Sequence, residues 1–314
     1  MHLLVYLPLV LPLVAAVAAR RLGVRLPPAV ATWLLAGSAV ALAAASNAVL
    51  GLLALTALLR VPMAAAVGHW SLRVVRANDP TSLPIALVAG ALLAVTGVFA
   101  CRALWHRVGA LAAAYQEARC LPGGGQVVVT DDDAADAYTL PGWPCRIVIT
   151  AGMMRALSHP EREVLLAHER AHATGLHYLF TTAARLAAAV NPLLRPVATT
   201  VGYTVERWAD ERAAAVTGDR SLAARAIARA ALAVAAAPPT RTGPAIALGA
   251  VTSGPAMRRA GPVPRRVAAL LLPAPKHQLV LLVAAVVLVA VSGVAALEAA
   301  RDLHNLLEIA RAAA

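Results

Sequence analysis

The chain has 314 residues, of which 60% are hydrophobic and only 14% are charged, and its mean hydropathy is +0.70. Soluble globular proteins usually carry about 45 to 50% apolar and about 25% charged residues. The composition therefore indicates an integral membrane protein and excludes a disordered, collagen-like or disulfide-stapled chain. The net charge is +12, and Lys276 is the single lysine among 28 basic residues. The three cysteines form no CxxC pair and so indicate no cysteine zinc site.

Four uncharged stretches are long enough to cross a bilayer, which takes about 20 mainly apolar residues in a helix. In chain order they are residues 3–19, 26–59, 80–101 and 277–297. The second is longer than one straight crossing, so we expect a helix that tilts, kinks or extends beyond the membrane. A hairpin of two short helices is the alternative. It would bring Arg60 into or near the bilayer, at about 2.5 to 3.5 kcal/mol if the charge lay at the centre.

The first stretch is predicted to be a retained span with its N-terminus outside, rather than a cleavable signal peptide. A signal peptide carries its positive charges before the apolar stretch, whereas Arg20, Arg21 and Arg25 follow this one. The arginines near Trp70 run against this orientation, and an interfacial helix there would accommodate them. The positive-inside rule predicts that residues 102–276 are cytoplasmic, because basic residues crowd before the fourth stretch. These are Arg258, Arg259, Arg265, Arg266 and Lys276.

The polar region between the third and fourth stretches begins with three short β-rich runs. They span residues 126–130, 137–140 and 146–150 and are separated by turn residues. Such a pattern predicts a small antiparallel sheet. The aspartates of the first turn could hold a second metal ion, but we expect a simple acidic turn. These are Asp131, Asp132, Asp133 and Asp136.

Helices are predicted to follow the sheet. Ser158 and Glu161 have the spacing of a capping box and Gly175 is a typical stop, so the sequence predicts a helix over 159–174. Later signals predict two further helices and a basic linker rich in proline and glycine. These are a helix around Trp208 that ends near Gly218, a helix over 221–237, and the linker over 238–276.

The predicted helix over 159–174 contains the sequence HERAH at 168–172. Side chains at i and i+4 lie on one face of a helix, so the imidazoles of His168 and His172 can reach one tetrahedral Zn²⁺. The adjacent Glu169 can then act as general base on a water molecule. The alternative is two structural histidines in an amphipathic helix. The position of the motif, between a start and a stop signal in the polar region, favours the metal site.

Glu206 is the best candidate for a third zinc ligand. A hydrolytic zinc site uses three protein ligands and keeps one open position. Glu206 and Asp210 lie at i and i+4 on one face of the next predicted helix, so Glu206 can bind the metal while Asp210 accepts the spare N–H of a ligand histidine. The alternative is a solvated acidic face paired with Arg207 and Arg212. Three candidates for stabilising the oxyanion, each with a structural alternative, are His177, Tyr203 and Arg212.

The stretch 126–237 resembles the peptidase domain of the BlaR/MecR-type membrane zinc peptidases, the β-lactam sensor-transducer family. The matching pieces are AYTLPG at 137–142, RIVITAGMM at 146–154, the HERAH box, Asn191-Pro192, and ERWAD at 206–210. The resemblance implies a gluzincin-like fold, zinc-dependent peptide hydrolysis in signal transduction and a winged-helix repressor as a possible substrate. Because the fourth span is followed by a short tail, we expect no penicillin-binding sensor domain and no direct β-lactam sensing.

We therefore predict a mainly α membrane protein with four transmembrane helices and a cytoplasmic α+β zinc peptidase domain between spans three and four. It would hydrolyse a membrane-proximal or cytoplasmic regulatory protein. We expect no nucleic acid partner, because the arginine pairs before the fourth span serve to hold the inner leaflet. The predicted limits are 1–108 for spans one to three, 109–237 for the peptidase domain, 238–276 for the linker, 277–298 for span four and 299–314 for the tail.

Two alternatives to this function stay open. One is a quality-control protease of the HtpX type, although those proteases typically place membrane spans between their HExxH and ExxxD boxes. Here that interval contains Arg185, Pro192, Arg195 and Pro196 and offers no clean span. The other is a non-catalytic membrane transducer with a structural zinc site. Glu169 argues against it, because a structural site has no use for a base beside an open coordination position.

Overall fold

The computed structural model describes residues 3–78, 82–142, 145–237, 263–273 and 278–313. Within these ranges, four helices are long and apolar enough to cross a membrane. They are α1 (Leu7–Arg25), α2 (Pro28–Leu59), α5 (Leu83–Cys120) and α13 (Leu279–Ala312). These four candidate spans match the four stretches predicted from the sequence, and the chain is mainly helical. Its four apolar helices indicate a multi-pass membrane protein.

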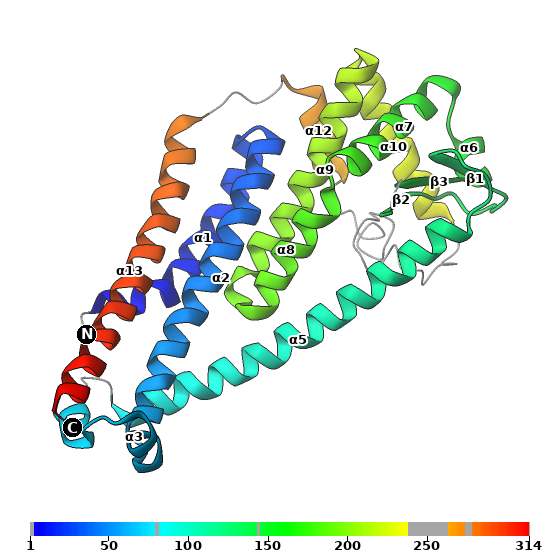
Figure 1. Ribbon diagram of the computed structural model, residues 1–314. Helices are drawn as coiled ribbons and strands as arrows, with labels where there is room; N and C mark the ends of the chain where they lie inside the picture. The colour runs from blue at the N-terminus through cyan, green and yellow to red at the C-terminus, as the bar shows by residue number, and fades with distance from the viewer. Residues whose placement is uncertain (1–2, 79–81, 143–144, 238–262, 274–277, 314) are drawn as a thin grey trace.

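Two of these helices extend well beyond the apolar stretches that predicted them. Helix α5 continues through the predicted boundary at 108–109 to Cys120, and α13 continues through the predicted tail to Ala312. Both extensions are rich in alanine and other helix formers and contain no proline, so the first charges end the apolar stretch but not the helix. Figure 1 shows α5 running from the bundle of α1, α2 and α13 to the sheet.

The long second stretch forms one continuous helix of 32 residues, so the hairpin alternative is wrong. Arg60 lies at its C-terminal cap. Two short helices, α3 (Pro62–Gly68) and α4 (Leu72–Asn78), follow it and flank Trp70. The indole Nε1 of Trp70 donates a hydrogen bond to the carbonyl of Leu59 at 3.0 Å. Two short helices therefore flank Trp70, where a single interfacial helix around it was expected. A 3-10 turn, η1 (Leu3–Tyr6), precedes α1.

The sheet has three strands, β1 (Val127–Thr130), β2 (Ala137–Leu140) and β3 (Arg146–Thr150), in the order β1-β3-β2. Strand β2 pairs antiparallel with β3, but β1 pairs parallel with it, so the prediction of an antiparallel sheet is wrong for β1. All five residues of β3 are buried. The fully buried strand thus takes the central position and separates the two strands that are neighbours in sequence.

Three of the helices after the sheet were predicted from the sequence, those over 159–174, around Trp208 and over 221–237, and the others were not. They are α6 (Ala151–Ala156), α7 (His159–Thr174), α8 (His177–Val190), η2 (Pro192–Leu194), α9 (Arg195–Thr217), α10 (Arg220–Ala236) and α12 (Val263–Leu271). The capping box of Ser158 and Glu161 is formed at the start of α7. Gly218, with φ of +70°, ends α9 in a conformation that favours glycine.

Helix α12 corrects the prediction of a linker over 238–276. Residues 263–271 are helical and pack against α9 and α10, with Leu270 buried in a shared apolar cluster. The rest of the predicted linker lies mostly outside the described residues. The run is too short, and too rich in arginine and proline at its start, for its sequence to show a helical period.

The hairpin of α8 and α9 packs directly against α1 and α2, where they share the largest apolar cluster. Gly23 of α1 allows the close approach, because a Cβ there would lie 2.5 Å from the Thr200 methyl. At the turn of the hairpin, the amide of Asn191 donates to the Ser46 hydroxyl, midway along α2, at 3.1 Å. The Arg207 guanidinium donates to the carbonyl of Gly23 at 3.0 Å. These contacts join the polar region to the membrane helices.

Candidate active site

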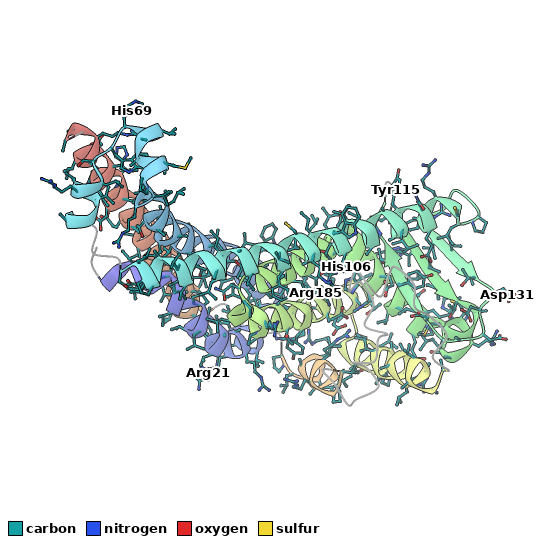
Figure 2. All side chains as sticks on the ribbon, turned by 90° about the horizontal axis from the view of Figure 1, so that it is seen from below. Arg21, His69, His106, Tyr115, Asp131 and Arg185 are labelled. Carbon is teal, nitrogen blue, oxygen red and sulfur yellow. The ribbon has the colours of Figure 1, made fainter. Side chains whose placement is uncertain are left out.

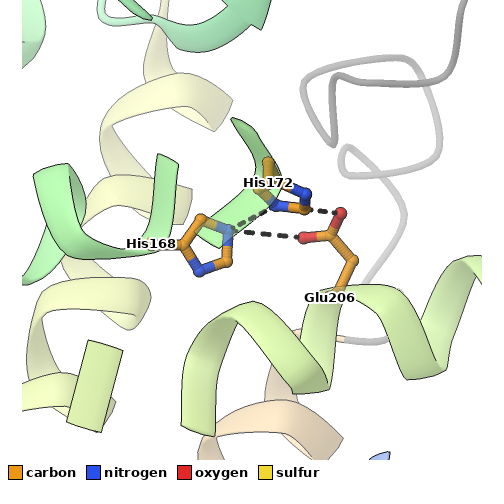
Figure 3. A group of neighbouring side chains, drawn as sticks. All are labelled: His168, His172 and Glu206. Atoms are coloured by element: carbon orange, nitrogen blue, oxygen red, sulfur yellow. Dashed lines mark hydrogen bonds and ion pairs between the residues drawn. The ribbon is translucent and has the colours of Figure 1, made fainter. Parts of the chain in front are cut away.

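His168 and His172 of α7 and Glu206 of α9 lie close enough together to hold one metal ion. Their potential ligand atoms are all within 4.8 Å of one another. Figure 3 shows the three side chains converging between the two helices. Each side chain is no more than 10% exposed. Within the described ranges this is the single such group, so the aspartates of the β1–β2 turn form no comparable cluster.

The spacing of the three ligand atoms fits a tetrahedral zinc site. The Nε2 atoms of His168 and His172 are 3.0 Å apart, and each lies 3.7 Å from a different oxygen of the Glu206 carboxylate. Around one Zn²⁺, with bonds of about 2.0 to 2.1 Å, neighbouring ligand atoms are about 3.3 Å apart. The observed distances of 3.0 and 3.7 Å lie on either side of that value. Two imidazoles and one carboxylate are also the donor set of a catalytic zinc site, which leaves a fourth position for the reaction.

The second nitrogen of each imidazole has a neighbour of its own. His168 Nδ1 lies 3.1 Å from an oxygen of Asp210, and His172 Nδ1 lies 3.0 Å from Nδ1 of His177. A proton on each Nδ1 would satisfy these neighbours and leave each Nε2 lone pair directed at the shared position. Asp210 therefore lies beside His168, one of the two histidines that the sequence predicts as metal ligands.

Burial and the neighbouring charged groups shift the pKa values of the two histidines in opposite directions. Burial alone would lower the pKa of His168, but the carboxylates of Asp210 and Glu206 outweigh it and raise that pKa to about 10. Burial lowers the pKa of His172 to about 3, so its imidazole is neutral and can bind a metal. Burial opposes ionisation of Glu206, but Arg266 prevails and lowers its pKa to about 2. Metal binding would thus displace a proton from His168.

Glu169 is buried, with 6% of its surface exposed, and is held by a residue of the sheet. The hydroxyl of Thr139 on β2 lies 2.9 Å from a carboxylate oxygen of Glu169 and 3.1 Å from its backbone carbonyl. Burial raises the pKa of Glu169 to about 7, although His168 and Thr139 act in the opposite direction. A carboxylate with a pKa near neutrality can both take up and release a proton at physiological pH.

Arg266 of α12 is part of this site, whereas its place in the sequence predicted a contact with the inner membrane leaflet. It is 4% exposed and forms a two-pronged contact with Asp210, with distances of 2.7 and 2.6 Å. Its Nη1 lies 3.0 Å from Glu206. Thr139 was missed as well. Neither residue belongs to a local sequence motif with the histidines, because each reaches the site from an element far away in sequence.

The three candidates for stabilising an oxyanion differ in their positions. His177 contacts the His172 ring and lines a cavity of about 20 Å³ beside Glu206. Burial lowers the pKa of His177 to about 4, so its ring is neutral. Tyr203 instead faces the guanidinium groups of Arg207 and Arg265. Arg212 is exposed. Of the three, only His177 touches a metal-site side chain in the contacts of the described residues.

A row of rings connects the site to α2. It runs from Trp33 of α2 through Phe180, Trp208 and His177 to His172, with centroid separations of 4.6, 5.9, 4.6 and 4.9 Å. Leu176, before His177, adopts the left-handed conformation at φ of +48°, which is costly for a leucine. The tight turn that needs this conformation brings His177 back towards His172.

Replacing Thr139 with valine is expected to slow peptide hydrolysis about tenfold, because one hydrogen bond to a carboxylate is worth about 1.5 kcal/mol or more. Zinc content should stay unchanged, because Thr139 touches no metal-site ligand atom. Steady-state cleavage of an unfolded protein would measure the effect. The Thr139→Ser variant keeps the hydroxyl and should retain nearly full activity. Equal losses in both variants would show that the hydrogen bond is unimportant.

One comparison with known proteins identifies the family of this chain. A model of peptidase family M48 matches residues 106–274, which is more than half of the chain and contains every residue of the candidate site. No curated protein and no solved structure matches the chain significantly. The chain therefore belongs to peptidase family M48, a family of usually zinc-dependent metalloproteases, and has four candidate membrane spans.

Proposed function

We propose that this protein is a membrane-embedded zinc endopeptidase in which His168, His172 and Glu206 hold the metal and Glu169 is the general base. The convergence of the three ligand atoms within 4.8 Å is the observation that carries the proposal. The raised pKa of Glu169 and its fixed position next to His168 support its role. Asp210 and His177 would orient the two ligand imidazoles from behind.

Zinc, when bound, supplies a Lewis acid that polarises the scissile carbonyl and favours ionisation of a nearby water. Glu169 takes a proton from the attacking water and later gives it to the leaving amine, so the peptide bond is replaced by a carboxylic acid and an amine. Thr139 keeps the carboxylate of Glu169 aligned for both transfers. Because β2 is an edge strand, an extended substrate can pair with it beside Glu169.

The substrate proposed is a membrane-proximal or cytoplasmic regulatory protein, as in the BlaR/MecR-type family that the sequence resembles. A winged-helix repressor is one such protein. The family match is equally compatible with a quality-control protease of the HtpX type. Helix α8 has 14 residues and is not among the candidate spans of the described part. The α8–α9 turn nevertheless contacts Ser46 midway along α2, so this interval does not separate the two alternatives.

The metal content of the full chain, purified in detergent, tests the proposal. Wild-type protein should bind about one zinc per chain. Glu206→Gln should weaken zinc binding by more than the roughly 10- to 100-fold that is lost when a residue hydrogen-bonded to a metal ligand is removed. The matched control is Glu163→Gln, an exposed glutamate on α7 that should leave zinc binding unchanged. Unaltered zinc affinity in Glu206→Gln would refute the ligand set. A zinc-loaded wild type that cleaves no protein would instead support the non-catalytic transducer.

A further inference from the structure

A second, positively charged site lies between α5 and the α8–α9 hairpin, away from the metal site. It is an open cleft of about 700 Å³. Four of its lining residues are basic and come from three helices: Arg102 and His106 from α5, Arg185 from α8, and Arg195 from α9. Figure 2 shows His106 and Arg185 near each other where α5 passes α8, and both line the cleft.

The three arginines of the cleft have no acidic partner among the described residues. Within the described ranges, no aspartate or glutamate lines the cleft, and none of the four basic side chains takes part in an ion pair. All four residues are exposed. Gathering like charges at one place costs free energy unless an anion is present. The cleft therefore has the charge of an anion-binding site and free donors with which to bind a phosphate oxygen.

The surroundings of the cleft are those of a lipid-facing surface. Arg102 is the first charge after the uncharged residues 83–101 of α5, and Trp105, which is 80% exposed, follows it. Arginine and tryptophan directly after an apolar run are typical of the membrane–water boundary. Val95, Val98 and Phe99 are between 52% and 68% exposed on the same helix. An acyl chain can lie along them while its headgroup occupies the cleft.

The α8–α9 turn adds an independent argument for a lipid. Pro192 and Arg195 of this region line the cleft, and Asn191 beside them binds Ser46, midway along α2. The cleft is thus built against the membrane helices rather than on the far side of the polar region. An unpaired arginine near the bilayer is costly, and a lipid phosphate would offset that cost.

We propose that this cleft binds the phosphate headgroup of an anionic phospholipid. Basic pockets between membrane helices bind such headgroups by charge. The site is separate from the peptidase chemistry, so its test measures lipid binding and not cleavage.

The test uses the full chain, stripped of lipid in detergent and then titrated with phosphatidylglycerol or with phosphatidylcholine. Native mass spectrometry counts the bound lipids. Wild-type protein should bind phosphatidylglycerol at least tenfold more tightly than phosphatidylcholine. The double variant Arg185→Gln, Arg195→Gln should lose about tenfold or more of this affinity. The matched control is the double variant Arg20→Gln, Arg21→Gln, which removes two exposed arginines near the end of α1. It should bind phosphatidylglycerol as tightly as wild type does. Thermal unfolding confirms that each variant is folded.

Three results would overturn the proposal. The first is a folded cleft variant that binds phosphatidylglycerol as tightly as wild type does. The second is an equal loss in the control, which would show a general effect of charge. The third is complete displacement of the bound lipid by millimolar inorganic phosphate, which would make the site one for free phosphate.

Discussion

Replacing Glu169 with glutamine is expected to reduce peptide hydrolysis at least a hundredfold and to leave the metal bound. The amide has nearly the shape of the carboxylate and can still contact Thr139, but it cannot take a proton from water. Positioned general bases contribute about 10²- to 10⁴-fold to rate. Cleavage of an unfolded protein by the purified full chain would measure the rate, and elemental analysis would measure zinc.

The matched control for this prediction is Glu163→Gln. It makes the same chemical change on the same helix, but its side chain is 64% exposed. It should cleave at the wild-type rate. If Glu169→Gln cleaves as fast as this control does, another group is the base. If Glu169→Gln also loses its zinc, Glu169 supports the metal site rather than acting on water, and the proposed role is wrong.

The parts of the fold that local sequence determines were predictable. Ser158 and Glu161 set the start of α7 and Gly175 its end, so the helix over 159–174 and the face shared by His168 and His172 followed from short-range rules. Gly218 ended α9 in the same way. Glu206 and Asp210 could be proposed together because their spacing put them on one face. In the structure both carboxylates lie beside the histidines.

The features that were missed depend on contacts between distant segments. The parallel pairing of β1 with β3 depends on which strand takes the buried centre, and the strand pattern alone does not decide this. Thr139 reaches Glu169 only because the sheet packs against α7. The packing of α8 and α9 on α1 and α2 was missed too, because apolar residues within a polar region do not reveal which surface they cover.

The close packing of α9 on the membrane helices has a consequence for the site. Glu206 and Arg207 are adjacent on α9, and while Glu206 faces the histidines, Arg207 binds the carbonyl of Gly23 on α1. The helix that carries Glu206 is thus anchored to α1 through the next residue along the chain. A shift of α1 relative to α7 would move Glu206 directly, so the membrane helices support the geometry of the site rather than serving only as a tether.

Arg266→Gln is expected to destabilise the zinc-free protein by about 3 to 5 kcal/mol, the cost typical of leaving a buried charge without its partner. Asp210 and Glu206 are 1% and 7% exposed, and Arg266 compensates both. Zinc is a second source of positive charge beside Glu206, so adding it should restore more stability to this variant than to wild type. Thermal unfolding with chelator and with zinc would measure both differences.

The neighbouring arginine provides the control, because Arg265→Gln removes the same charge from the same helix. Arg265 is exposed and contacts the Tyr203 ring at 5.7 Å, so its loss should cost about 1 kcal/mol or less. A larger gain from zinc in Arg266→Gln than in this control would show that the guanidinium and the metal compensate the same carboxylates. Equal unfolding temperatures for the two variants, with and without zinc, would mean that Arg266 does not stabilise the site.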